Sequence, residues 1–391
     1  MSVTAGAEGP TAGARPWGDV RRLLVERARV RRQPFLDTRA DEVEQVLARL
    51  DSVEPAPWVE AFGALAEAHE RAARGAEAAG DRERAAAEWL LAAGYWRVAR
   101  YPAPTSAPKR AAHERARSSY LAAARYFDPP LEEVRIPFRG RAGDGDHVLA
   151  HLRRPHGLER PPVAVVWGGI DAFKEERRGD AYLAEGLATL AMEMPGIGGS
   201  PIVGAPDAER LWDPVFEWLG ARDDVDGTRI GIVGGSTGGY WAVKLAHVRR
   251  DRIAAAACHG GCVHHAFTRE WMERAQVGEY PFEFGETLAA AFGLRTYEEW
   301  VAFAPRLSLL DAGILDRPCA PLLLVNGAND TVFPIADMHL LLERGDPKSA
   351  RFYQAGHMGP YRDAEKLIAR WLATTLRAPA ERPTVAASRG A

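Results

Sequence analysis

Cysteine is scarce in this sequence, with three residues in 391: Cys258, Cys262 and Cys319. Three cysteines cannot all pair, which excludes the disulfide framework of a small secreted domain and favours a reducing compartment, the cytoplasm. The sequence also lacks any run of 18 apolar residues, and its first residues lack the basic start and apolar segment of a signal peptide. We therefore expect a protein that is neither exported nor inserted in a membrane.

A strong net charge is missing as well. The sequence has 50 Lys and Arg residues against 53 Asp and Glu residues, a formal charge of -3. This balance gives no reason to expect nucleic acid or an anionic membrane as a partner. A small-molecule substrate is expected instead, on the motifs described below. The sequence does not fix the oligomer, although a homodimer is compatible with it.

The length predicts two folding units, because a single core stops growing at roughly 250–300 residues. Residues 17–130 have helical periodicity, rich in Ala, Leu, Arg and Glu, with breaks at Gly80 and Pro102. They are expected to form an all-helical cap domain. The ends of the chain, residues 1–16 and 379–391, are expected to be disordered.

Strand-like segments begin after Asp128-Pro129-Pro130, and we assign residues 131–378 to a second domain. Two alternating segments, at residues 133–138 and 147–152, are typical of antiparallel strands. Six short apolar runs then alternate with amphipathic stretches, which predicts a mostly parallel, eight-stranded sheet covered by helices on both faces. Residues 262–318 are helical and aromatic-rich, and we interpret them as a lid inserted between two strands.

One turn carries the main chemical signal. The segment Gly234-Gly235-Ser236-Thr237-Gly238 follows an apolar strand and opens a helix, which is the context of the nucleophile-elbow motif G-x-S-x-G. The glycines are needed because the turn beside the serine is too tight for Cβ atoms. A glycine-rich turn that only packs strand against helix is the alternative. We favour Ser236 as a nucleophile.

Two further residues complete a catalytic constellation. Serine needs a base, and the base needs a third group that fixes its tautomer. Asp330 ends the strand LLLVNGAND, and His357 ends the strand RFYQAGH, so both are expected at the same edge of the sheet as Ser236. The order Ser, Asp, His is that of the α/β-hydrolase fold. We therefore predict a Ser236-His357-Asp330 triad on this fold, which requires no cofactor.

An oxyanion formed at Ser236 needs backbone N–H donors. Thr237 is expected to supply one, and Gly169, with Ile170 as the second choice, the other. Trp167 and His259, at the ends of neighbouring strands, are expected to contact the substrate.

Two other clusters are given non-catalytic roles. The segment 258–265 contains two cysteines and three histidines, but its spacing matches no standard zinc pattern, so no metal is predicted. The charge run 174–178 is expected to be a solvated helix start, with orientation of the oxyanion loop as the alternative.

The segments 168–176, 194–200 and 356–359, together with the elbow and Asp330, resemble the FrsA-like branch of α/β-hydrolases, which includes 2,6-dihydroxypseudooxynicotine hydrolase. The resemblance extends from about residue 80 onward. It implies a helical segment that forms part of the substrate cavity, and cleavage of esters or of carbon–carbon bonds beside a ketone. Glu193 departs from the pattern, because relatives often carry aspartate in that loop.

The expected function is therefore hydrolysis of an ester or a ketone-adjacent carbon–carbon bond in a mid-sized hydrophobic metabolite, polyketide-like or aromatic. One alternative is elimination of an acyloxy group from a secondary metabolite by the same triad. Another is a helical-repeat binding module joined to an inactive hydrolase domain, although no 34-residue period is visible.

Overall fold

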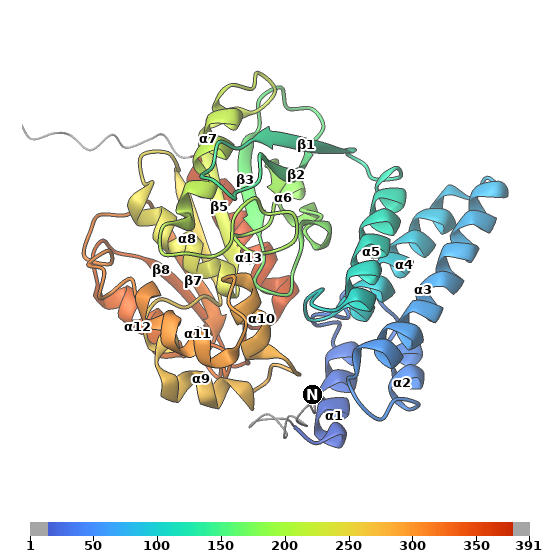
Figure 1. The fold of residues 1–391 in the computed structure, drawn as a ribbon. Helices are drawn as coiled ribbons and strands as arrows, with labels where there is room; N and C mark the ends of the chain where they lie inside the picture. The colour runs from blue at the N-terminus through green and yellow to red at the C-terminus, as the bar shows by residue number, and fades with distance from the viewer. Residues whose placement is uncertain (1–14, 378–391) are drawn as a thin grey trace, which may run out of the picture.

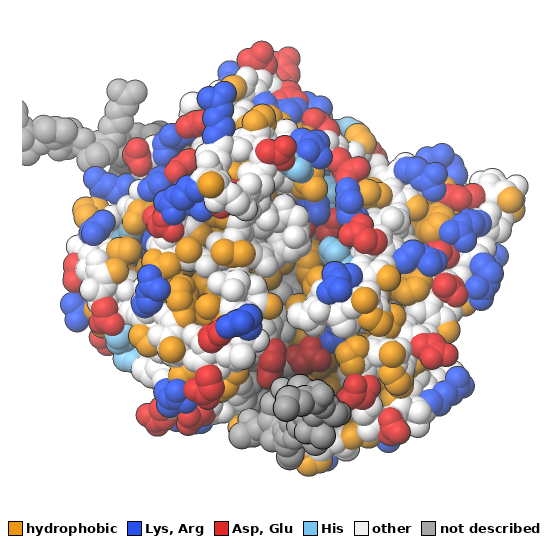
Figure 2. Space-filling view, viewed as in Figure 1, with side chains coloured by type: hydrophobic (Ala, Val, Ile, Leu, Met, Phe, Trp, Pro, Cys, Tyr) orange, Lys and Arg blue, Asp and Glu red, His pale blue; other side chains and the backbone are white. Residues whose placement is uncertain are grey.

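The computed structural model describes residues 15–377. Disorder is predicted for residues 1–16 and 379–391. Residues 1–14 and 379–391 lie outside this range, and residues 15 and 16 lie inside it, directly before the first helix. None of the helices in residues 15–377 combines the length and the apolar character that crossing a membrane requires. Acidic and basic side chains are interspersed over the face that Figure 2 shows.

Five helices form the N-terminal part of the chain, which stands beside the sheet domain (Figure 1). Asp81 caps the fourth helix, since its side chain accepts the N–H of Arg84, and Trp58, Phe62 and Tyr95 are buried in a separate core. The helices are α1 (Trp17–Arg29), α2 (Ala40–Leu47), α3 (Pro55–Ala78), α4 (Arg82–Arg100) and α5 (Ala107–Ala124).

An eight-stranded sheet follows, in the order β1-β2-β4-β3-β5-β6-β7-β8. β2 pairs antiparallel with β1 and with β4, and the other neighbours are parallel, which confirms the predicted mostly parallel sheet. The strands are β1 (Leu131–Pro137), β2 (His147–Arg153), β3 (Pro162–Trp167), β4 (Ala188–Ala191), β5 (Asp226–Gly235), β6 (Ala255–His259), β7 (Leu322–Gly327) and β8 (Ser349–Tyr353).

Helices cover both faces of the sheet because successive strand residues point to opposite sides. Ile232 packs in the core shared with α7 and α8, whereas Val233 packs in the core shared with α6 and α13. The covering helices are α6 (Asp180–Ala184), α7 (Asp213–Gly220), α8 (Thr237–Val248), α12 (Ile335–Glu343) and α13 (Tyr361–Arg377). Short 3-10 helices lie at Lys174–Glu176 (η1) and Ala208–Leu211 (η2).

The lid is inserted in the chain between β6 and β7 and consists of short helices (Figure 1). Its segment 279–283 packs against the N-terminal helices. The Phe282 ring contacts Trp58 edge-on with centroids 5.5 Å apart, and the buried Lys109 of α5 forms an ion pair with Glu283 at 2.9 Å. The lid helices are η3 (His265–Phe267), α9 (Arg269–Gln276), α10 (Phe284–Ala291), α11 (Tyr297–Phe303) and η4 (Ala304–Leu307).

The prediction that the charge run 174–178 is a solvated helix start is wrong. Lys174 and Glu175 are buried in η1, and Lys174 lies 3.0 Å from Glu193. Glu176 pairs with Arg100 of α4. Lys174 is paired with Glu193 beside β4, and the N-terminal helices supply the cation that pairs with Glu176; the local sequence reveals neither partner.

Candidate active site

Ser236 occupies a sharp turn between β5 and α8. Its backbone has φ 54° and ψ -131°, a conformation that costs energy for any residue with a Cβ atom. Cβ atoms at Gly234 and Gly238 would overlap the carbonyl oxygens of Gly238 and Gly168 respectively. The glycines of the motif are therefore required for the close packing that holds Ser236 in this conformation.

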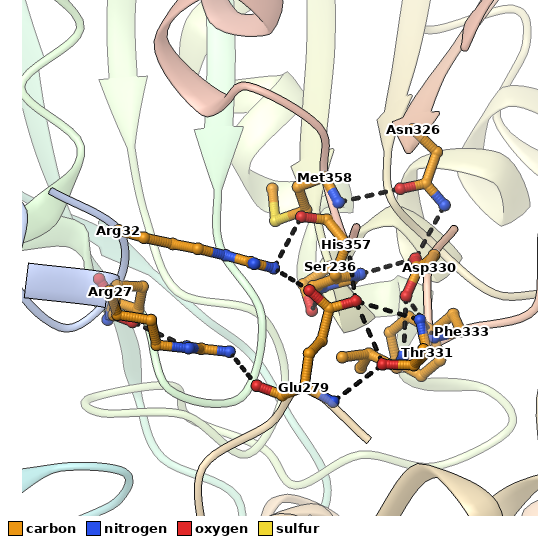
Figure 3. A network of polar contacts seen from close by, with 12 residues as sticks. Arg27, Arg32, Ser236, Glu279, Asn326, Asp330, Thr331, Phe333, His357 and Met358 are labelled. Atoms are coloured by element: carbon orange, nitrogen blue, oxygen red, sulfur yellow. Dashed lines mark hydrogen bonds and ion pairs between the residues drawn. The ribbon is translucent and has the colours of Figure 1, made fainter. Parts of the chain in front are cut away.

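The structure brings the side chains of Ser236, His357 and Asp330 together (Figure 3). Ser236 Oγ lies 2.9 Å from His357 Nε2, and His357 Nδ1 lies 2.8 Å from Asp330 Oδ2. His357 follows β8 and Asp330 follows β7, so the carboxyl ends of neighbouring strands deliver both residues to one edge of the sheet. This is the geometry that a serine nucleophile, a general base and an orienting carboxylate need.

The Asp330 carboxylate is almost fully buried, at 5% exposure, but it is not short of hydrogen-bond donors. Its Oδ1 accepts the N–H groups of Val332 at 2.7 Å and Phe333 at 2.9 Å. Its Oδ2 accepts from Asn326 at 2.8 Å in addition to His357. Four donors replace the water that an ionised carboxylate would otherwise bind, so the buried charge is stabilised.

Gly169 borders the nucleophile. A Cβ atom at this position would lie 3.1 Å from Ser236 Oγ and 3.2 Å from the nitrogen of Thr237. Within residues 15–377, the N–H groups of Thr237, Gly169 and Ile170 have no backbone acceptor. The loop after β3 and the start of α8 therefore present three backbone N–H groups without a backbone acceptor beside Ser236. The side chain of Ile170 is buried in the core.

An apolar pocket adjoins Thr237 and is closed above by the lid. The Thr237 hydroxyl is buried without a hydrogen-bond partner in the described part of the chain, as is the Trp300 indole N–H. The remaining walls are mostly aromatic and aliphatic, and the side chains leave little free space between them. The walls contributed by the lid include Phe267, Trp271, Phe284, Leu288, Phe292 and Trp300.

Trp167 and His259 do not line this pocket, and their expected contact with the substrate stays a prediction. The indole of Trp167 packs on Trp212 and donates to the Gly238 carbonyl beneath the elbow at 2.9 Å. The ring of His259 stacks on Tyr361 of α13, on the opposite face of the sheet from Cys258. Strand alternation points both side chains into the protein although both backbones end at the functional edge.

Glu279 of the lid contacts the loop that carries Asp330 and the loop that carries His357. The sequence analysis did not identify this residue. Its carboxylate accepts the N–H of His357 at 2.8 Å and that of Thr331 at 3.1 Å. It also lies 2.7 Å from Arg32, whose guanidinium reaches the site from the N-terminal helices (Figure 3). Burial alone would raise the pKa of the Glu279 carboxyl, but the Arg32 guanidinium and the N–H groups of Thr331 and His357 lower it to about 2.

The Cys/His segment does not bring together the side chains of a metal site in the described part of the chain. No group of three or more His, Cys, Asp or Glu side chains within residues 15–377 is placed to hold a metal ion. Burial raises the pKa of Cys258 to about 12, and that of Cys262 well above its ordinary value, so both thiols stay protonated.

The sequence and fold are similar to those of known proteins. A model of the family described as "Esterase FrsA-like" matches residues 55–377. The Esterase FrsA of Yersinia pestis is 27% identical over 262 residues, which cover 65% of this chain. The same region of Esterase FrsA from Yersinia pseudotuberculosis matches equally well. The alignment spans 61% of these relatives' own length.

Two solved structures share the fold over most of their length. The 2,6-dihydroxy-pseudo-oxynicotine hydrolase aligns with a TM-score of 0.71 and 23% identity, and covers 85% of this chain and 92% of its own. AbyA5 aligns with a TM-score of 0.67 and 21% identity, and covers 86% of this chain and 93% of its own. The predicted α/β-hydrolase fold with N-terminal helices is thereby confirmed.

Proposed function

Because the chain belongs to the FrsA-like esterase family, we propose that it is a serine hydrolase in which Ser236 is the nucleophile, His357 the general base and Asp330 the orienting acid. The single observation that carries this proposal is the continuous hydrogen-bonded chain from Ser236 Oγ through the His357 imidazole to Asp330 Oδ2, at 2.9 and 2.8 Å.

The mechanism follows from these positions. His357 Nε2 takes the proton of Ser236 as Oγ attacks the substrate carbonyl, and Asp330 stabilises the imidazolium that forms. The N–H groups of Thr237 and Gly169, with Ile170 as the second choice for the latter, hold the developing oxyanion. The imidazolium then protonates the leaving alcohol, or the leaving carbon of a ketone-adjacent bond, and an acyl-enzyme remains. Water, activated by His357, releases the acid.

The pocket beside Thr237 supports a hydrophobic substrate of medium size. Its aromatic and aliphatic walls favour an aromatic or polyketide-like acyl group over an acetyl group. Because the walls leave little free space, the lid helices must move to admit such a substrate. We extend the proposal from esters to ketone-adjacent carbon–carbon bonds and to secondary metabolites; the solved hydrolase named for 2,6-dihydroxy-pseudo-oxynicotine shares the fold.

The proposal includes a location. Cys258, Cys262 and Cys319 are free, and two of them are buried. Unpaired thiols favour a reducing compartment, so we place the enzyme in the cytoplasm. A homodimer is the assembly that we propose to test first, by light scattering.

A labelling experiment tests the proposed chemistry. A fluorophosphonate probe should modify the wild-type protein at Ser236 and leave Ser236→Ala unmodified. Mass analysis of the products from a series of aryl esters and aryl ketones then separates ester hydrolysis, carbon–carbon cleavage and acyloxy elimination, since elimination yields an alkene. A wild-type protein that neither reacts with the probe nor turns over any substrate, but captures a partner through residues 15–130, would contradict the proposal and favour a binding module.

A further inference from the structure

Asn326 is a fully buried polar residue near the end of the apolar strand β7. Its Nδ2 donates to Asp330 Oδ2 at 2.8 Å, and its Oδ1 accepts the N–H of Met358 at 2.9 Å (Figure 3). A carboxylate can only accept and a backbone N–H can only donate, so these two partners fix the orientation of the amide. One side chain thus connects the loop of Asp330 with the loop of His357.

The two loops lie close together, which places the amide within reach of both. Ala328 N–H donates to the Tyr353 carbonyl at 2.8 Å, and Asn329 N–H donates to the Ala355 carbonyl at 3.0 Å. A Cβ atom at position 327 would overlap the Gly356 carbonyl oxygen. Only glycine at position 327 therefore permits this approach.

Met358, the residue after the proposed base, has an uncommon backbone conformation. Its φ is 64°, in the left-handed region that side chains with a Cβ atom disfavour. Asn326 holds its N–H, and His259 Nε2 donates to its carbonyl at 2.7 Å. Burial lowers the pKa of His259 to about 4, so the ring is neutral and Nε2 carries the donated proton. The chain direction after His357 is therefore fixed by two buried side chains.

We propose that Asn326 is a positioning residue, which holds the Asp330 carboxylate and the backbone after His357 in register so that the imidazole points at Ser236. This inference rests on the proposed function of Ser236. The carboxylate oxygen that accepts from His357 is the one that accepts from Asn326, so the amide restricts rotation of the carboxylate and withdraws part of its charge from the imidazole. Asn326 does not line the apolar pocket, so it acts on turnover and not on substrate binding.

The test is Asn326→Leu, which has a similar volume and makes neither hydrogen bond. We expect kcat for a p-nitrophenyl ester to fall about tenfold to hundredfold, with KM changed less than about threefold, because the base is misplaced while the pocket is intact. Asn329→Leu is the matched control: Asn329 is exposed in the same loop, and its substitution should leave kcat unchanged. Unchanged kcat in Asn326→Leu, or a rise in KM alone, would overturn the inference.

A second readout does not depend on turnover. Loss of the Asn326 amide leaves the His357 base misplaced relative to Ser236, so the rate at which a fluorophosphonate probe labels Ser236 should fall about tenfold or more. Equal labelling rates in the wild type and Asn326→Leu would contradict the proposed role. If Asn326→Leu does not fold, Asn326→Ser is used in its place. A serine hydroxyl is too short to bond both loops, so this variant should lower kcat in the same direction, but by a smaller factor.

The two proposals fail differently. If the wild type hydrolyses the ester, Ser236→Ala does not, and Asn326→Leu matches the wild type, only the positioning role is lost. If Ser236→Ala retains the wild-type rate, the proposed function itself is wrong, and the role of Asn326 is lost with it.

Discussion

The guanidinium of Arg32 lies 2.9 Å from the carbonyl oxygen of His357. Arg32 follows α1, and the same nitrogen donates to the Glu279 carboxylate at 2.7 Å. The N-terminal helices therefore do more than cover the sheet domain, because one of their side chains contacts both the proposed base and the lid glutamate that receives its N–H.

Removal of the Arg32 charge should slow turnover. In Arg32→Met, the Glu279 carboxylate loses its cation and the His357 carbonyl loses its donor, so we expect kcat to fall about tenfold, the loss of roughly one charge-assisted hydrogen bond. Steady-state kinetics with an aryl ester provide the measurement. Arg22→Met is the control, since Arg22 is exposed on α1 and, among residues 15–377, pairs only with Asp19. Equal kcat values in the two variants would show that the contacts of Arg32 with Glu279 and His357 do not contribute to turnover.

The Glu279 network should make stability depend on pH. Its pKa is lowered to about 2 in the folded protein, below the ordinary 4.5, so the stabilisation is fully present above pH 4.5 and is lost as the pH falls toward 2. Wild type should exceed Glu279→Gln in free energy of unfolding by an amount on the order of 3 kcal/mol at pH 7, and by much less at pH 3. Urea unfolding at pH 7, 5 and 3 measures this.

The lid offers a control for that experiment. Glu286 is exposed on α10, and Glu286→Gln removes a carboxylate of the same type without a buried partner. The free energy of unfolding of Glu286→Gln should stay close to that of the wild type at every pH. A constant difference between wild type and Glu279→Gln across the same range would argue against a depressed pKa.

A methyl group at position 169 should obstruct the oxyanion site. In Gly169→Ala, the new Cβ would lie 2.8 Å from Ser236 Cβ and 3.1 Å from its Oγ, so the substrate carbonyl cannot take its place without displacing the loop. We expect kcat/KM to fall about 100-fold or more. In Gly75→Ala, a Cβ on the exposed side of α3 meets nothing within 4 Å, and this control should keep full activity and gain about 0.5–1 kcal/mol. Similar values of kcat/KM in both variants would contradict the assignment of Gly169 to the oxyanion site.

A larger pocket should change the choice of acyl group. Leu288 is 3% exposed and lines the pocket, so Leu288→Ala should raise kcat/KM for longer acyl chains relative to shorter ones, at a cost of about 2–5 kcal/mol in stability. A p-nitrophenyl ester series reports the preference. Leu341→Ala makes a comparable cavity in α12 away from the pocket and should leave the ranking of esters unchanged. A shift in both variants would contradict the assignment of the pocket.

Local sequence signals predicted the residues whose positions depend on local geometry. Ser236 stands in a glycine-rich turn between a strand and a helix, and Asp330 and His357 follow apolar strands, so the sheet topology alone delivers all three to one edge. Asn326 left a weaker signal, a polar residue inside an otherwise apolar strand. Its two partners could not be predicted, because they depend on how closely two loops approach each other.

The errors and omissions have a different origin. Arg32 and Glu279 are 247 positions apart in the chain. The local sequence around each residue does not indicate that the two side chains form an ion pair. The predicted substrate contacts of Trp167 and His259 rest on the positions of their backbones, whereas side-chain direction at a strand end follows the twofold alternation. Both faces of the sheet are covered here, so a residue at the functional edge can still point into the interior.

The packing of lid residue Phe282 on Trp58, and of Glu283 on Lys109, also sets a limit on protein engineering. A truncated fragment that starts at β1 would retain every residue of the Ser236 constellation, yet it would expose aromatic surface on the lid and leave the Glu283 carboxylate without its cation. Such a fragment should aggregate on expression. The smallest unit worth producing for biochemistry or crystallisation is therefore the whole stretch from α1 to α13.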